Sequence, residues 1–176
     1  MNIKIRQETI SDFKQVFDLT ERAFEKLEIS DHTEQFLVER LRNSSVFVPE
    51  LSLVAEYENK IVGHILLTKL KIINGKEEFQ SLALAPVSVL PEYQNMGIGS
   101  KLIEAAHIKA REAGYKSVML VGHPHYYPRF GYKKSSDFGI RQSFEAPDEC
   151  CLAIELVENG LKGVSGTAEY PKEFFE

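Results

Sequence analysis

The chain has 176 residues, a formal net charge of -5 and 43% hydrophobic residues. This length and composition predict one soluble domain over residues 1–176, with a core over 3–156 and a C-terminal tail over 157–176. The acidic balance argues against non-specific nucleic-acid binding, which needs a basic surface. No stretch resembles a membrane span or a signal peptide, so we expect no membrane partner and a cytoplasmic location.

The two cysteines, Cys150 and Cys151, are adjacent. They offer neither a disulfide framework nor the ligand spacing of a zinc site. His123 and His125 form a His-x-His pair, but no third ligand is evident. We therefore expect no metal.

The first part of the chain predicts one strand and two helices. Residues 3–6 alternate between apolar and charged, as in a half-buried strand. Residues 13–27 carry apolar side chains at helical spacing after a capping box at 9–12. A second helix is expected around 36–41, where 31–34 supply the N-terminal cap and the polar residues 43–45 end it.

The middle of the chain predicts strands at 51–57, 61–73 and 79–89. Asn74-Gly75 is a strong hairpin signal between the last two. Pro86 cannot donate a ladder hydrogen bond, so the third strand should carry a bulge or a local break there.

Residues 98–113 then form an amphipathic helix, and strands follow at 117–121 and 150–156. A strand, a helix and a strand in this order favour a parallel crossover. We therefore predict an α/β fold with a central mixed sheet flanked by helices.

The loop that joins the proline-bearing strand to the third helix reads Gln94-Asn95-Met96-Gly97-Ile98-Gly99. The first turn of a helix offers unpaired N–H groups and partial positive charge, which together favour an anion. Glycines there let an anion approach the backbone. A plain strand-to-helix turn is the alternative, and the pattern matches neither the Rossmann fingerprint nor the P-loop.

The wider string from Val87 to Gly99 resembles the acetyl-CoA signature of the GCN5-related N-acetyltransferases, the GNAT family. The family's Gln/Arg-x-x-Gly-x-Gly/Ala core is matched at Gln94, Gly97 and Gly99. Tyr127-Pro-Arg-Phe-Gly-Tyr resembles the family's Tyr-x-x-x-Gly-Phe element. The order of the expected elements is similar to the family fold, and 123–127 and 163–175 resemble the bacterial YhbS-like branch.

This resemblance implies an N-acetyltransferase in which a primary amine attacks the thioester of acetyl-CoA directly. The acceptor would be a small molecule or a peptide, and the protein a monomer or a homodimer. The alternative is a sensor or scaffold that binds acyl-CoA without turnover. The segment around Asp31 and His32 lies where the family usually admits acceptors, although a helix cap is the simpler role for Asp31.

The resemblance also implies roles for particular residues. In the family, the strand that carries Val87 and Val89 contacts the pantetheine arm, and the helix start holds the pyrophosphate. The implied cofactor-binding set is Val87, Ser88, Val89, Gln94, Asn95, Met96, Gly97, Ile98, Gly99, Ser100, Tyr127 and Phe130.

Tyr127 occupies the position of the general acid, which protonates the departing thiolate, and its neighbour Tyr126 is the alternative. Because an alkylammonium must lose a proton before it attacks, a base is also needed. Glu56 is a candidate for this base, as are His123 and His125.

Overall fold

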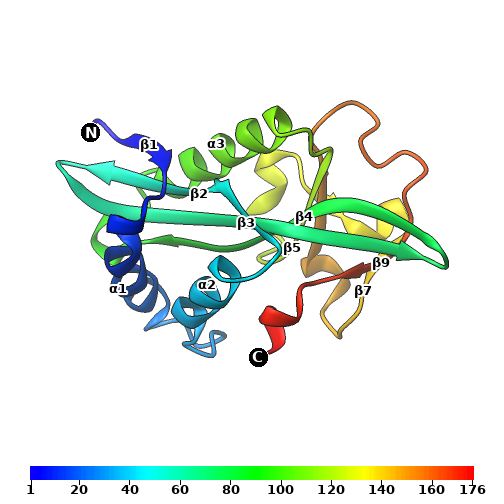
Figure 1. Cartoon of the computed structure of the whole chain (residues 1–176), viewed down its shortest axis with the longest axis horizontal. Helices are drawn as coiled ribbons and strands as arrows, with labels where there is room; N and C mark the ends of the chain where they lie inside the picture. Colours follow the sequence, from blue (N-terminus) through cyan, green and yellow to red (C-terminus); the bar gives the residue numbers. More distant parts are fainter. The chain divides into compact units, whose positions relative to one another are not determined.

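The computed structural model describes all residues, 1–176, and resolves them into two compact units. The first unit comprises Met1–Thr68 and Ala85–Lys109, and the second comprises Lys69–Leu84 and Ala110–Glu176. Strands β3 (Lys60–Asn74) and β4 (Glu77–Val89) belong to both, and Figure 1 follows them as the two long green strands. The prediction of a single domain stays a prediction.

The first unit contains two further strands and three α-helices beside its portions of β3 and β4. Its other elements are β1 (Lys4–Gln7), α1 (Phe13–Phe24), α2 (Glu34–Arg42), β2 (Phe47–Tyr57) and α3 (Ile98–Glu112), the last of which ends in the second unit. Strand β2 pairs antiparallel with both β1 and β3. The predicted capping box forms, since the Thr9 amide donates to Asp12 Oδ2 at 2.8 Å.

Two boundaries in this unit differ from the prediction. Helix α1 ends at Phe24 rather than at Leu27, whose side chain is exposed and so adds little packing that would extend the helix. Strand β2 begins at Phe47 and contains Pro49. Its pairing with β3 is irregular between Phe47 and Ser52, so the proline lies where no ladder hydrogen bond is lost.

A buried polar network ties α2 to the sheet of the first unit. Glu8 forms an ion pair with Arg42 and accepts a hydrogen bond from Ser52 Oγ at 2.7 Å. His64 Nε2 lies 3.0 Å from the same hydroxyl. Because Ser52 has given its only proton to Glu8, His64 must donate through Nε2. His64 Nδ1 is buried without a partner.

The second unit carries the remaining strands. They are β5 (Ser117–Val121), β6 (Lys133–Lys134), β7 (Ile140–Gln142), β8 (Cys151–Glu155) and β9 (Gly166–Glu169). Strand β4 pairs parallel with β5, and β5 pairs antiparallel with β8, so this sheet is mixed as predicted. Its core contains Ile72, Met119, Ala153 and Tyr170.

The predicted C-terminal tail contains a strand that sequence patterns did not reveal. Strand β9 pairs with β3 through Lys71 to Ile73 and with β7. A Cβ at Gly166 would lie 2.2 Å from the carbonyl oxygen of Ile73, so only glycine fits this close approach. Four residues of strand without alternation are too few to stand out in a sequence.

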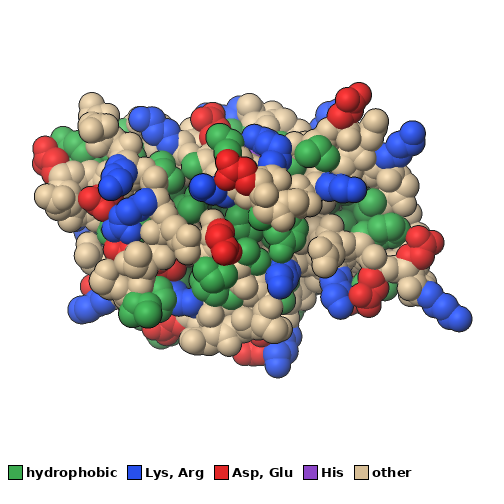
Figure 2. Space-filling view, turned by 45° about the horizontal axis from the view of Figure 1, so that its top comes forward, with side chains coloured by type: hydrophobic (Ala, Val, Ile, Leu, Met, Phe, Trp, Pro, Cys, Tyr) green, Lys and Arg blue, Asp and Glu red, His purple; other side chains and the backbone are tan.

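Two further features concern the character of the helices and the charged side chains on the surface. No helix combines the length and apolar character needed to cross a bilayer. On the face drawn in Figure 2, acidic and basic side chains are interspersed.

Candidate active site

The segment from the end of β4 to the start of α3 is held in place by local hydrogen bonds. The Leu90 amide donates to the Val62 carbonyl at 2.9 Å, and Gln94 Nε2 donates to the Val89 carbonyl at 3.0 Å. Asn95 and Gly97 then adopt left-handed backbone conformations, with φ of 62° and 80°. The Gln94 side chain thus folds the loop back onto the strand that precedes it.

The N-terminus of α3 presents unpaired backbone donors. The first helical bond runs from the Lys101 amide to the Gly97 carbonyl, so the amides of Ile98, Gly99 and Ser100 have no partner within the helix. A Cβ placed on Gly97 would meet no atom within 4 Å. The space in front of the loop is therefore open, and it suits an anion such as a pyrophosphate.

Gly63 positions this helix start, and sequence reasoning missed it. A Cβ on Gly63 would lie 2.9 Å from Leu102 Cδ1 and 3.1 Å from Ile98 Cγ2. Because Gly63 lacks a side chain, the first turns of α3 pack directly on β3. A glycine inside a predicted strand is the signal that could have indicated this close approach.

The end of β4 alternates between buried and partly open positions. Val87 and Val89 are half-buried, whereas Ser88 between them is buried. Ser88 Oγ has no hydrogen-bond partner in the protein. The two valines therefore offer backbone and apolar surface to a ligand, whereas the Ser88 side chain points to the other, buried face of the strand.

The turn before the loop is tied to α1 and to the β2–β3 turn. Glu92 accepts from Arg22 at 3.0 Å and lies 3.6 Å from Lys60. The Lys60 ammonium also lies 5.6 Å from the centre of the Tyr93 ring. These ion pairs are exposed and individually weak, but together they restrain the turn that leads into the loop.

Tyr127 belongs to the second unit and begins the short 3-10 helix Tyr127–Phe130. Its ring packs over Gly122, where a Cβ would lie 2.6 Å from Tyr127 Cε2. Burial, together with the neighbouring Tyr126, raises the pKa of Tyr127 to about 12. This raised pKa keeps the hydroxyl protonated at neutral pH, as a proton donor must be.

Tyr126, the alternative acid, is engaged in a local cluster. The Arg129 guanidinium lies over its ring at 4.6 Å, and Arg129 Nε donates to its carbonyl at 3.0 Å. Its ring also meets Phe130 edge-on at 5.4 Å. Phe130 therefore packs against Tyr126, whereas Tyr127 packs over Gly122.

The three candidate bases differ in environment. Glu56 lies on β2 and accepts a hydrogen bond from Arg6 Nε at 2.9 Å, so its carboxylate is paired. His123 and His125 are exposed, with ring centres 5.7 Å apart. The chain contains no group of three or more side chains placed to hold a metal ion.

Comparison with known proteins identifies the family. Residues 4–135 match the model of the acetyltransferase (GNAT) domain. The chain is 36% identical to the N-acetyltransferase YjhQ of Escherichia coli K12 over 140 residues, which cover 79% of this chain and 75% of YjhQ. It is 28% identical to the N-acetyltransferase YhbS of the same organism over 171 residues, which cover 97% of both chains.

Solved structures agree with this assignment. The crystal structure of E. coli YhbS in complex with CoA has a TM-score of 0.89 at 25% identity and covers 100% of this chain and 93% of that chain. A GNAT acetyltransferase from Brucella melitensis in complex with acetyl-CoA has a TM-score of 0.81 at 30% identity and covers 98% of both chains. The predicted fold and the predicted resemblance to YhbS are both confirmed. The chain therefore belongs to the GNAT family of acetyltransferases.

Proposed function

We propose that this protein transfers an acetyl group from acetyl-CoA to a primary amine. The observation that supports this proposal most strongly is the open N-terminus of α3. Three successive amides there lack helical partners, and Gly97 leaves space for an anion to reach them. The solved relatives that contain CoA and acetyl-CoA support the choice of donor. The pyrophosphate would bind at 95–100, and Val87 and Val89 would contact the pantetheine arm.

In the proposed reaction, the amine nitrogen attacks the thioester carbonyl carbon, and the C–S bond breaks as the C–N bond forms. Tyr127 gives its phenolic proton to the departing sulfur and recovers a proton from the nascent amide nitrogen. Its raised pKa keeps the proton in place until the sulfur develops charge. The products are an N-acetylated amine and free CoA thiol.

The ammonium form of the acceptor must first lose a proton. Glu56 is the carboxylate proposed for this step, and its pairing with Arg6 means that the ion pair must open before it accepts a proton. The variant Glu56→Gln tests this role, because a base acting before attack affects the rate at low pH far more than at high pH. An identical loss of rate at all pH values would assign Glu56 to structure alone.

Calorimetric titration with acetyl-CoA, followed by measurement of thiol release with a broad panel of amines, tests the proposal. The variant Gly97→Val should abolish acetyl-CoA binding, because valine is strained at positive φ and projects into the open space. Gly75→Val is the matched control, since Gly75 has φ of +60° and open surroundings at the β3–β4 hairpin.

If Gly97→Val binds acetyl-CoA as well as Gly75→Val does, the loop is not the donor site. Binding of acetyl-CoA without thiol release from any amine would contradict transfer and favour a binding module instead.

A further inference from the structure

Gly122 directly follows β5 and is held in place by the sheet of the second unit. Its amide donates to the Cys150 carbonyl at 2.9 Å, which extends the antiparallel β5–β8 ladder beyond the pair formed by Val121 and Cys151. Its φ lies outside the left-handed region that favours glycine. The conformation of the backbone therefore does not require a glycine at this position.

The Tyr127 ring is what requires the glycine. A Cβ on Gly122 would lie 2.6 Å from Tyr127 Cε2 and 3.1 Å from Leu120 Cδ1. Ordinary van der Waals contact begins at about 3.4 Å, so a methyl group here would displace the edge of the ring by about 0.8 Å, the difference between 3.4 and 2.6 Å. The ring thus occupies space that only a residue without a side chain leaves open.

Two other aromatic rings restrict the Tyr127 ring further. The ring centres of Tyr126 and Tyr132 lie 5.1 and 5.7 Å from that of Tyr127, and both contacts are edge-on. Tyr132 is only 3% exposed, so its ring is itself fixed by packing. The backbone of Gly122 and these two rings together limit the directions in which the Tyr127 hydroxyl can point.

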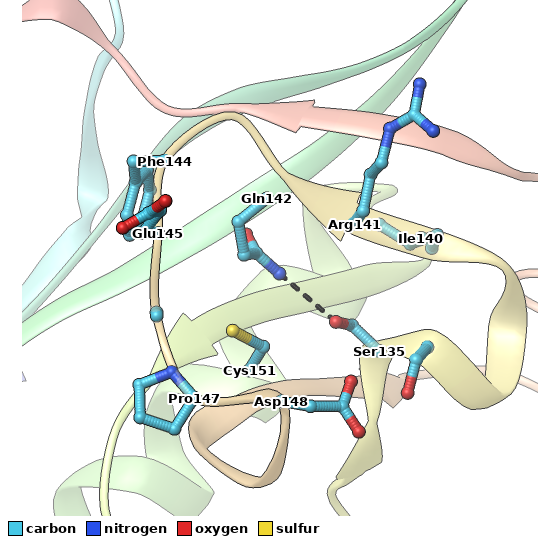
Figure 3. A pocket seen from close by; sticks show the side chains of 11 residues that line it. Ser135, Ile140, Arg141, Gln142, Phe144, Glu145, Pro147, Asp148 and Cys151 are labelled. Carbon is cyan, nitrogen blue, oxygen red and sulfur yellow. Dashed lines mark hydrogen bonds between the residues drawn. The ribbon is translucent and has the colours of Figure 1, made fainter.

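The two faces of the β5–β8 ladder have different surroundings at this end. Val121 and Cys151 are directly opposed, so their side chains share one face. Cys151 lines a cavity of about 630 Å³ there (Figure 3). Because side chains alternate along a strand, Gly122 belongs to the opposite face, which Tyr127 covers. A change at Val121 therefore leaves the contact between Gly122 and Tyr127 intact.

A displacement of this size matters for proton transfer. A general acid must come within about 2.6–3.2 Å of the atom that it protonates. Misplacing a reacting group by about 1 Å lowers a rate by about 10²-fold. A methyl group at position 122 should therefore slow proton delivery by moving the Tyr127 ring, without removing any group that gives or takes a proton.

We propose that Gly122 is a positioning residue, whose bare backbone holds the Tyr127 ring in the orientation from which its phenol gives up a proton. Tyr132 supports the same orientation through its ring. The inference rests on the proposed acetyl transfer and on Tyr127 as its general acid.

The variant Gly122→Ala tests this inference in steady-state thiol release, with the amine of the panel that gives the highest rate. Its kcat should fall about 10²-fold, while the Kd of acetyl-CoA in calorimetry stays within about twofold of that of the unmodified protein. Val121→Ala is the matched control, since it alters the adjacent residue, which is 40% exposed, on the other face. Its kcat should change by less than about twofold.

A double-mutant cycle separates positioning from folding. Tyr127→Phe keeps the ring but removes the proton, so adding Gly122→Ala to it should lower kcat by no more than about twofold. A residue that served only the fold would cause the same loss in both backgrounds. If urea unfolding shows that Gly122→Ala is not folded, Tyr132→Leu tests the same orientation. It should lower kcat about three- to tenfold in the unmodified background and not in Tyr127→Phe.

The outcomes distinguish this inference from the proposed function. No acetyl-CoA binding, or no thiol release with any amine, contradicts the transfer itself, and an unchanged kcat in Tyr127→Phe contradicts the acid; the positioning role falls with either. A slow Tyr127→Phe beside an unimpaired Gly122→Ala overturns the positioning role alone. Equal losses in both backgrounds, or weaker acetyl-CoA binding in place of a lower kcat, overturn it as well.

Discussion

Replacing His64 with glutamine should remove much of the loss of stability that acid causes in this protein. His64 is completely buried in the Glu8–Arg42–Ser52 network. Burial lowers its pKa from 6.5 to about 4 and outweighs the attraction of Glu8 for the protonated ring. Glutamine keeps an N–H donor near the position of Nε2 but does not titrate in this range.

The direction and size of the effect follow from proton binding. Between pH 6.5 and 4, the unfolded chain binds a proton at His64 that the folded chain does not, so the free energy of unfolding falls as the pH falls. The full shift corresponds to about 3 kcal/mol, of which about 2 kcal/mol is lost by pH 5. Asp12, whose pKa is lowered to about 2 mainly by its hydrogen bond to Arg6, adds a loss only below pH 3.8.

Urea unfolding at pH 7.5 and pH 5 measures this difference. The unmodified protein should lose about 2 kcal/mol more than His64→Gln over this interval. His125→Gln, at an exposed histidine, should behave like the unmodified protein. Equal losses in the unmodified protein and His64→Gln would refute the reasoning, as would an NMR titration that placed the pKa of His64 at or above its ordinary value.

Three further substitutions test the site and the fold. Tyr127→Phe should lower turnover by about 10² to 10⁴ while acetyl-CoA affinity in calorimetry stays nearly constant, and Tyr126→Phe should have little effect; equal rates for both would reassign the acid. Arg42→Met should lower the free energy of unfolding in urea by about 3–5 kcal/mol, because it leaves Glu8 buried with its charge uncompensated, and a change below about 1 kcal/mol would contradict that account. Gly63→Val should destabilise the protein by about 1–3 kcal/mol and weaken acetyl-CoA binding, since a Cβ there overlaps the first turns of α3; unaltered binding would mean that this packing does not position the helix start.

The features that the sequence predicted correctly depend on near neighbours. The Asn74-Gly75 hairpin follows from backbone preferences that act within a few residues. The amphipathic pattern of α3 likewise depends on residues three and four apart. The motif at 94–99 could be recognised in the sequence because its residues are likewise close together in the chain.

The features that the sequence did not predict depend on contacts between residues far apart in the chain. Glu8, Arg42, Ser52 and His64 look like unrelated polar residues until folding buries them together. Gly166 looks like part of a flexible tail until β9 pairs with β3.

The amino-acid sequence by itself determined the family and most of the secondary structure, because these depend on local motifs and periodicity. Tertiary structure alone decided which polar groups became buried partners and which glycines admit a neighbouring element. These depend on strand register and packing across long separations, which no pattern within a short window encodes.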